Sequence, residues 1–214
     1  MEQNNNLQDW DDTFSKKMRE LAVVDSAHDF LHFQRVVNTA KRLCREHQGD
    51  LNIVLPAAWL HDLVSFPKDH PDRPKASYFS AQAAIDYLKS VGYPDSFLDP
   101  IFHAIESHSF SANMAPLTLE AKIVQDADRL DALGAIGISR CFAVGGMLNR
   151  AIYSGDDPFC EHRIPDDSRY TIDHFYSKLF SIAKTLQTAS GRAEGEKRVH
   201  AMKEYLRQLE SEIF

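Results

Sequence analysis

The residues best suited to chemistry are an adjacent histidine and aspartate, His61 and Asp62. They directly follow the apolar run Val54–Leu60, which we expect to form a largely buried helix. An ionised carboxylate is unfavourable in an apolar interior unless a cation or several hydrogen-bond donors stabilise it. Neighbouring helical side chains point about 100° apart, so these two can share an ion only if it lies in a gap between helices. Such a site requires further ligands from other helices.

Two other segments offer ligands of the right type. His32 lies one helical turn before Arg35, on the same predicted helical face. The segment 125–131 places three carboxylates in an otherwise apolar helix. Taken alone, the histidine is typical of a helix cap and the carboxylates of a solvated face. The order His, His-Asp, Asp along three helices instead predicts a metal site, because imidazole and carboxylate groups are common metal ligands.

Periodicity alone does not choose the last carboxylate. At 100° per residue, the middle of the apolar stripe falls on Ile123, Ala127 and Leu130. Asp126 and Asp128 flank this stripe on opposite edges. Both therefore stay candidates at this point.

The elements that would position these residues are helices throughout. Apolar residues recur at three- and four-residue steps, and strand-like alternation is almost absent. We expect Gly49 to end the second helix and Asp50 or Asn52 to cap the third. Pro56 is tolerated if it lies near the first turn of that helix and otherwise kinks it. The pattern predicts one all-α domain over residues 1–214, with loops at 65–76 and 156–167. Helices are expected at about 77–91, 96–107, 118–132 and 134–142, and apolar stripes mark further helices that include 7–21, 30–44, 54–60, 172–186 and 199–209.

Composition narrows the function classes. The 214 residues are 43% hydrophobic, which is too apolar for a disordered chain. They carry 24 Lys and Arg against 31 Asp and Glu, a net charge of -7, and no aromatic-basic pattern, which argues against nucleic-acid binding. The longest apolar run, Ile53–Leu60, is too short to span a bilayer, so we expect no membrane partner.

From the cysteines and the polar first residues we expect a cytoplasmic protein. Cys44, Cys141 and Cys160 form no C-x-x-C motif and are odd in number, which favours a reducing compartment. The polar start of the chain does not resemble a signal or transit peptide.

The amphipathic helix at 199–209 is expected to serve core packing or a homodimer contact.

Three short motifs carry a family resemblance. His32–Val36 looks like an H-x-x-R-V helix, Ala57–Asp62 like A-x-x-[LF]-H-D, and Ala127–Leu130 like A-D-[RK]-L. In this order they resemble the HD-domain superfamily of metal-dependent phosphohydrolases, whose signature is H…HD…D. Further stretches are similar to a bacterial subgroup of small, stand-alone HD hydrolases, so the resemblance runs from about residue 27 to the end. Those stretches are 68–73, 104–111, 122–137 and 174–179.

The resemblance implies an HD-type helical bundle with a metal site between its central helices. The core signature would cover about 27–142, and helices at about 170–214 would pack on it. His32, His61, Asp62 and Asp128 would bind one divalent ion, Mn²⁺, Mg²⁺ or a similar metal, with Asp126 as the alternative to Asp128. Asp131 is expected to support a metal-bound histidine as a neighbouring carboxylate.

The resemblance also implies a substrate class. It suggests hydrolysis of a small phosphorylated metabolite, a nucleotide, with cleavage of a nucleoside triphosphate to monophosphate and pyrophosphate as the specific reaction. We assign catalytic roles to Asp62 and to His108, a candidate general acid whose ordinary pKa lies near neutrality. Counter-charge for the phosphates would come from the loop after Asp62. Its candidate substrate-binding residues are Lys68, His70, Arg73 and Lys75.

Two other functions are known for proteins that this sequence resembles, and both are kept as alternatives to phosphohydrolase activity. Some HD proteins hold two irons and perform oxygenation, using two extra histidines between the HD pair and the last aspartate. His103 and His108 occupy that interval here. The other alternative is a non-catalytic, nucleotide-sensing HD module, which the presence of all four signature ligands disfavours.

Overall fold

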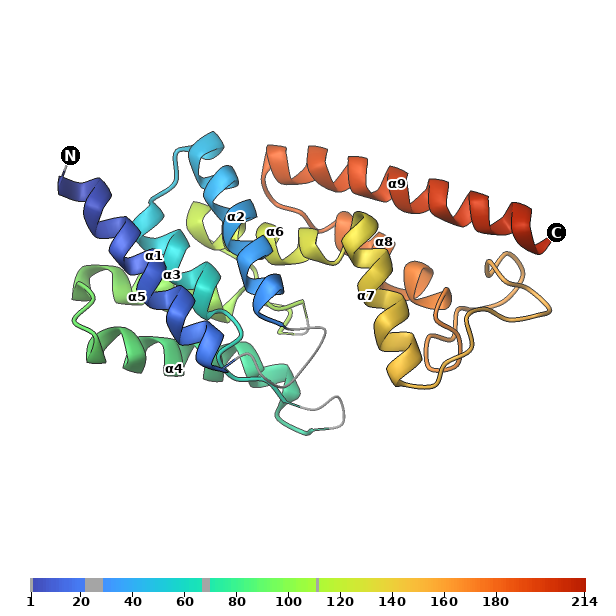
Figure 1. Ribbon diagram of the computed structural model, residues 1–214, viewed down its shortest axis with the longest axis horizontal. Helices are drawn as coiled ribbons and strands as arrows, with labels where there is room; N and C mark the ends of the chain where they lie inside the picture. The colour runs from blue at the N-terminus through green and yellow to red at the C-terminus, as the bar shows by residue number, and fades with distance from the viewer. Residues whose placement is uncertain (1, 22–28, 67–69, 111) are drawn as a thin grey trace. The chain divides into compact units, whose positions relative to one another are not determined.

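The computed structural model describes residues 2–21, 29–66, 70–110 and 112–214 (Figure 1). Every regular element within these ranges is helical, apart from an isolated parallel bridge between Ala151 and Tyr170, which confirms the all-α prediction. The longer helices are α1 (Glu2–Leu21), α2 (Phe30–His47), α3 (Leu51–Leu60), α4 (Ala76–Ser90), α5 (Leu98–Glu106), α6 (Leu119–Asp131), α7 (Gly134–Met147) and α9 (Ala189–Ile213). The short ones are η1 (Arg73–Lys75), η2 (Asp95–Phe97), η3 (Phe175–Leu179) and α8 (Phe180–Ala183).

The chain divides into two compact units, Met1–Asp128 and Arg129–Phe214. In the first unit, α3 packs against α1, α2, α4 and α5. Its residues Val54 to Leu60 are all buried, so α3 is apolar on every side. A helix of that kind is stable only as the centre of a core. The unit therefore surrounds the segment that ends at His61.

Pro56 lies inside α3 without breaking it. A proline has no N–H to give to the carbonyl four residues earlier, which here belongs to Asn52. The Tyr93 hydroxyl donates a 2.7 Å hydrogen bond to that carbonyl instead. At the start of the helix, the Asp50 side chain accepts from the backbone N–H of Asn52 at 2.8 Å, so Asp50 is the cap.

The end of α2 differs from the expectation. Gln48, and not Gly49, adopts the left-handed conformation, with φ of 58°. Gly49 has a packing role, because a Cβ placed on it would lie 3.0 Å from the Ile123 side chain of α6. The lack of a side chain thus allows α6 to approach the end of α2 closely.

In the second unit the predicted helix at 172–186 is wrong in detail. The backbone forms a π-helical turn at Phe175–Leu179 and then the short α8, which packs against both this turn and α9. The last helix begins at Ala189, ahead of the apolar stripe that starts at Val199, and the Thr188 side chain caps it by accepting from Gly191 N–H at 3.0 Å. Gly195 then lets the Leu186 side chain approach, since an added Cβ would lie 2.3 Å from it. The first turns of α9 carry glycines at buried positions where an apolar side chain would otherwise mark the helical repeat, so the apolar pattern does not predict them.

A buried ion pair organises the long loop of this second unit. Asp173 is fully buried, and its two carboxylate oxygens accept hydrogen bonds from the Arg163 guanidinium. The backbone N–H of Asp166 donates to the same carboxylate at 2.6 Å. These donors supply what a buried carboxylate requires.

No single helix in the described ranges is both long and apolar enough to cross a bilayer. The pair α6 and α7 has that length and composition when taken together, but the two helices are bent by 62° relative to each other.

Candidate metal centre

His61 stands at the centre of the candidate site. It follows the last residue of α3, and its Nδ1 lies 2.9 Å from the Ala58 carbonyl. Nδ1 therefore carries the proton and donates it, which leaves Nε2 as the lone-pair atom. The side chain is fully buried, and its Nε2 has no hydrogen-bond partner among the described residues. A buried nitrogen of this kind requires an explanation, and metal ligation is one.

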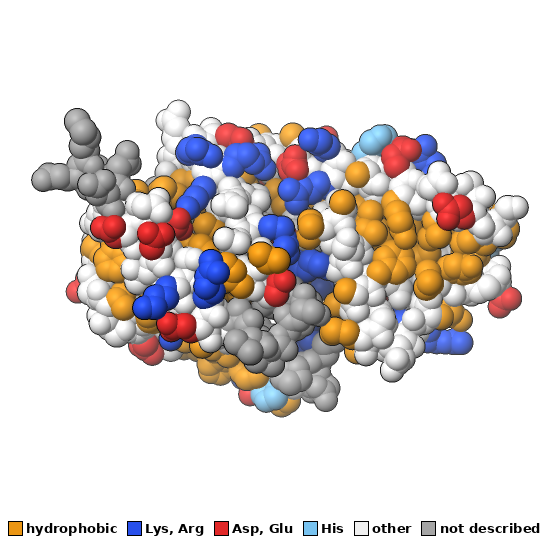
Figure 2. Space-filling view, viewed as in Figure 1, with side chains coloured by type: hydrophobic (Ala, Val, Ile, Leu, Met, Phe, Trp, Pro, Cys, Tyr) orange, Lys and Arg blue, Asp and Glu red, His pale blue; other side chains and the backbone are white. Residues whose placement is uncertain are grey.

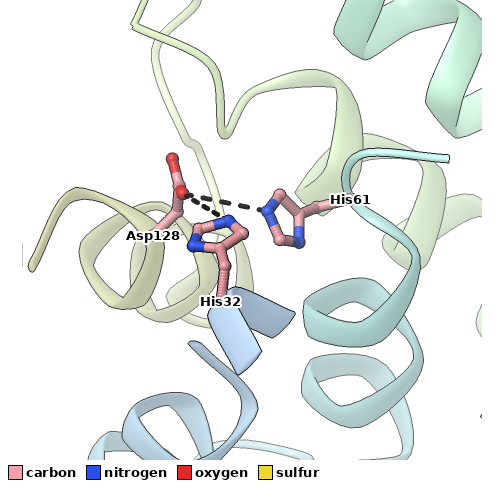
Figure 3. Close-up of side chains that lie close together, drawn as sticks. All are labelled: His32, His61 and Asp128. Carbon is pink, nitrogen blue, oxygen red and sulfur yellow. Dashed lines mark ion pairs between the residues drawn. The ribbon is translucent and has the colours of Figure 1, made fainter. Parts of the chain in front are cut away.

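Two imidazoles converge on one carboxylate oxygen (Figure 3). Asp128 Oδ1 lies 3.7 Å from His32 Nε2 and 3.8 Å from His61 Nε2. Both distances are too long for direct hydrogen bonds. The Asp29 side chain caps α2 by accepting from the His32 backbone N–H at 2.9 Å, which fixes the turn that carries this histidine. The three ligand atoms lie within 4.8 Å of one another, so the group could hold a metal ion.

A second group shares His61. Asp62 Oδ2 lies 3.7 Å from His61 Nε2, and Asp62 Oδ1 lies 3.4 Å from His108 Nε2. His108 follows the end of α5 and is buried, with its Nδ1 2.6 Å from the Ile105 carbonyl. These three residues also could hold an ion. The donor set of two or three imidazoles and two partly exposed carboxylates fits a divalent cation.

The two central histidines titrate in opposite directions. Burial lowers the pKa of His61 to about 4, against the raising effect of the nearby carboxylates. Its imidazole is therefore neutral at pH 7, which is the ligating form. Burial also acts to lower the pKa of His108, but the hydrogen bond and charge of Asp62, together with Asp128, raise it above its ordinary value. His108 thus holds a proton more readily than a free histidine does.

The structure favours Asp128 over Asp126 as the converging carboxylate. Asp128 is 26% exposed at its side chain and forms the contacts just described, whereas Asp126 is fully buried and belongs to neither candidate metal group.

Asp131, expected beside a metal-bound histidine, places its Oδ2 2.8 Å from Arg140 Nη1. This ion pair joins two residues of the second unit.

The candidate substrate residues lie in and before η1. His70 stacks on Phe66, with ring centroids 4.5 Å apart, and its Nδ1 accepts from the Asp72 backbone N–H at 3.1 Å. Lys75 Nζ lies 3.2 Å from Asp72 Oδ1, and Arg73 is partly exposed. The hydrogen bond of His70 and the ion pair of Lys75 both join residues of segment 70–75 to one another. Lys68 lies outside the described residues.

His103 and His108 do not act as a pair in the structure. His103 Nε2 accepts a 2.9 Å hydrogen bond from the Leu117 backbone N–H, so its lone pair is occupied. Only His108 belongs to a candidate metal group. The di-iron alternative, which requires both histidines as ligands, therefore loses one of them.

Gln125 is a residue that the sequence reasoning missed. It is fully buried on α6, and its Nε2 donates a 2.7 Å hydrogen bond to the Ser107 carbonyl. Ser107 immediately precedes His108, and Asp128 follows Gln125 by one helical turn. The only available signal was a polar amide within an otherwise apolar helical stretch.

Comparisons with known proteins agree with this geometry. The HD domain family model matches residues 30–133, a range that contains all five residues of the two groups. The protein YpgQ of Bacillus subtilis is 34% identical over 192 residues, covering 88% of this chain and 85% of the relative. The crystal structure of YpgQ in complex with ADP superposes on this chain with a TM-score of 0.75 and 31% sequence identity, and the match covers 96% of each chain.

An HD-superfamily hydrolase from Bacillus thuringiensis gives the same TM-score of 0.75 at 27% identity, covering 96% of this chain and 97% of that one. The relationship thus extends over nearly the whole length of each of these proteins. The chain belongs to the HD domain family.

Proposed function

We propose that this protein is a divalent-metal-dependent phosphohydrolase whose substrate is a nucleotide. The observation that carries the proposal is the buried Nε2 of His61, which has no hydrogen-bond partner among the described residues and faces two carboxylates. The likeness to an HD-superfamily hydrolase supports hydrolysis, and the ADP complex of YpgQ supports a nucleotide. The specific reaction we propose is cleavage of a nucleoside triphosphate to monophosphate and pyrophosphate.

His32, His61, Asp62 and Asp128 would hold the ion, which we propose to be Mn²⁺, Mg²⁺ or a similar metal. When bound, a divalent ion supplies charge that neutralises phosphate oxygens and acidifies a water molecule. The chain keeps His61 neutral by burial and orients it through the Ala58 carbonyl. The partial exposure of Asp62 and Asp128, 24% and 26%, keeps their carboxylates accessible from solvent.

His108 would act as the general acid. Its Nδ1 is held by the Ile105 carbonyl, and Asp62 keeps a proton on the Nε2 side of the ring by raising its pKa. A protonated Nε2 at this position can pass its proton to the oxygen that leaves the phosphorus. Asp62 thus has two roles in the proposal, as a ligand and as the group that orients His108.

The test is a hydrolysis screen on the full chain. Protein stripped with a chelator and reloaded with Mn²⁺ or Mg²⁺ would be incubated with nucleoside mono-, di- and triphosphates, and phosphate and pyrophosphate measured. We expect metal-dependent release that His61→Asn and Asp62→Asn reduce by at least about 100-fold. His162→Asn is the matched control, because that side chain is 87% exposed. Nucleotide binding without turnover under every metal would instead support a sensing module.

A further inference from the structure

A cluster of aromatic rings lies just beyond the candidate metal centre along the chain. Phe66 stacks on His70 and meets Phe79 edge-on, with centroids 5.8 Å apart. Tyr78 contacts both Phe79 and Phe102, at 5.7 and 5.8 Å. We call this cluster the aromatic shelf; it consists of Phe66, His70, Tyr78, Phe79 and Phe102.

The shelf is open to solvent. Tyr78 is 44% exposed and Phe79 36%, and the other three rings are only partly buried. Figure 2 shows hydrophobic side chains gathered along α4, on the lower edge of the first unit in this view. Contiguous exposed apolar surface is uncommon unless something binds there.

Two hydrogen bonds of a buried serine side chain join the start of α4, which carries two shelf rings, to the segment that follows Asp62. Ser80, one residue after Phe79, is fully buried, and its hydroxyl bonds both the N–H and the carbonyl of Val64, each at 3.0 Å. Val64 is two residues from Asp62, and Phe66 is four. Four residues span at most about 14 Å even when fully extended. The shelf therefore begins within a short reach of the carboxylate that faces His61 and His108.

Positive charge borders the same surface. Arg73 and Lys75 are the first and last residues of η1, which leads directly into α4 and its two exposed rings. Lys75 is 67% exposed, and its ion pair with Asp72 lies at the surface, because the Asp72 side chain is 43% exposed. An aromatic surface with cations beside it suits a ligand that joins a planar ring to phosphate groups.

We propose that the aromatic shelf stacks the base of the nucleotide while its phosphates reach the metal centre. This inference rests on the proposed function, and it supplies the base-binding element that the sequence did not reveal. Because every base has a π-face, stacking of this kind binds all nucleotides and discriminates little between bases. The shelf would thus select nucleotides over phosphorylated sugars without selecting one nucleotide.

The test compares two ligands that differ only by the base, AMP and ribose 5-phosphate. Calorimetric titration would measure both affinities in the wild-type protein and in Phe79→Leu, with Tyr78→Leu as the second, more exposed substitution. We expect the wild-type protein to bind AMP about tenfold more tightly than ribose 5-phosphate. Each variant should lose this preference, because the base would no longer stack on the aromatic ring that the substitution removes. Phe214→Leu is the control, since that ring is 85% exposed at the chain end.

The outcomes separate this inference from the proposed function. A preference for AMP that disappears in both variants supports the shelf, even if no nucleotide is hydrolysed. Hydrolysis of nucleotides with an unchanged AMP preference in both variants overturns the shelf and leaves the phosphohydrolase intact. Equal wild-type affinities for the two ligands overturn it as well. Circular dichroism spectra matching the wild type would show that the variants are folded.

Discussion

The side chain of Gln125 and the main chain of Ser107 are joined by a 2.7 Å hydrogen bond in the interior of the first unit. Gln125 belongs to the helix that carries Asp128, and Ser107 to the turn that carries His108. One buried amide thus connects the segments that present a carboxylate and an imidazole. Such a bond fixes the spacing between groups that must act together.

Replacing Gln125 with methionine should impair both stability and catalysis. The change keeps the length and volume of the side chain but leaves the Ser107 carbonyl without this donor, at a cost of about 1–3 kcal/mol in unfolding free energy. We expect kcat to fall more than KM rises, because His108 would be displaced. Urea denaturation and steady-state kinetics measure the two effects. Gln82→Met, on an exposed face of α4, should change neither; equal effects of the two substitutions would contradict the positioning role.

Asp128→Asn should weaken metal binding by at least about tenfold, whereas Asp126→Asn should retain the metal affinity of the wild type. The reason is that Asp128 Oδ1 faces two imidazole nitrogens, and Asp126 belongs to neither metal group. Titration of the chelator-stripped protein with Mn²⁺ measures the affinity independently of activity. If Asp126→Asn caused the larger loss, the ligand assignment would be reversed.

The metal-free protein should lose stability as pH falls from about 6.5 toward 4. The folded chain holds the pKa of His61 at about 4, whereas an unfolded histidine has a pKa of about 6.5. Between these values the unfolded state binds the extra proton, so acid favours unfolding. Chemical denaturation in chelator at several pH values should give a steeper slope for wild type than for His61→Asn, by up to about 1.4 kcal/mol per pH unit. Equal slopes would exclude His61 as the cause.

Arg163→Met should destabilise the protein by about 3–5 kcal/mol, because it leaves the fully buried Asp173 without its cation. The double variant Arg163→Met, Asp173→Asn should recover part of this loss, since the buried charge is gone. Denaturant titration of both, with the exposed Arg207→Met as control, measures the difference. A double variant less stable than Arg163→Met would show that the charge on Asp173 is not the source of the loss.

The sequence alone determined the helical class and the order of the chemical groups. Apolar periodicity located most helices within a few residues, because a buried helical face imposes its own repeat on the chain. The adjacent His61 and Asp62 stood out because a carboxylate directly after a buried apolar run requires a partner. Periodicity failed for the start of α9, where Thr188 and two glycines set the structure through capping and close approach.

Only the tertiary structure decided which groups meet. Within one helix the sequence gives the direction of each side chain, but the rotation of one helix relative to another depends on how their surfaces pack. The convergence of His32 and His61 on Asp128 rather than Asp126 is therefore a property of the packed α2, α3 and α6. The hydrogen bond from the Leu117 N–H that occupies His103 Nε2, and the hydrogen bonds between Ser80 and Val64 beside the aromatic shelf, have the same origin. They join residues 14 and 16 positions apart in the chain, a separation that no local sequence pattern records.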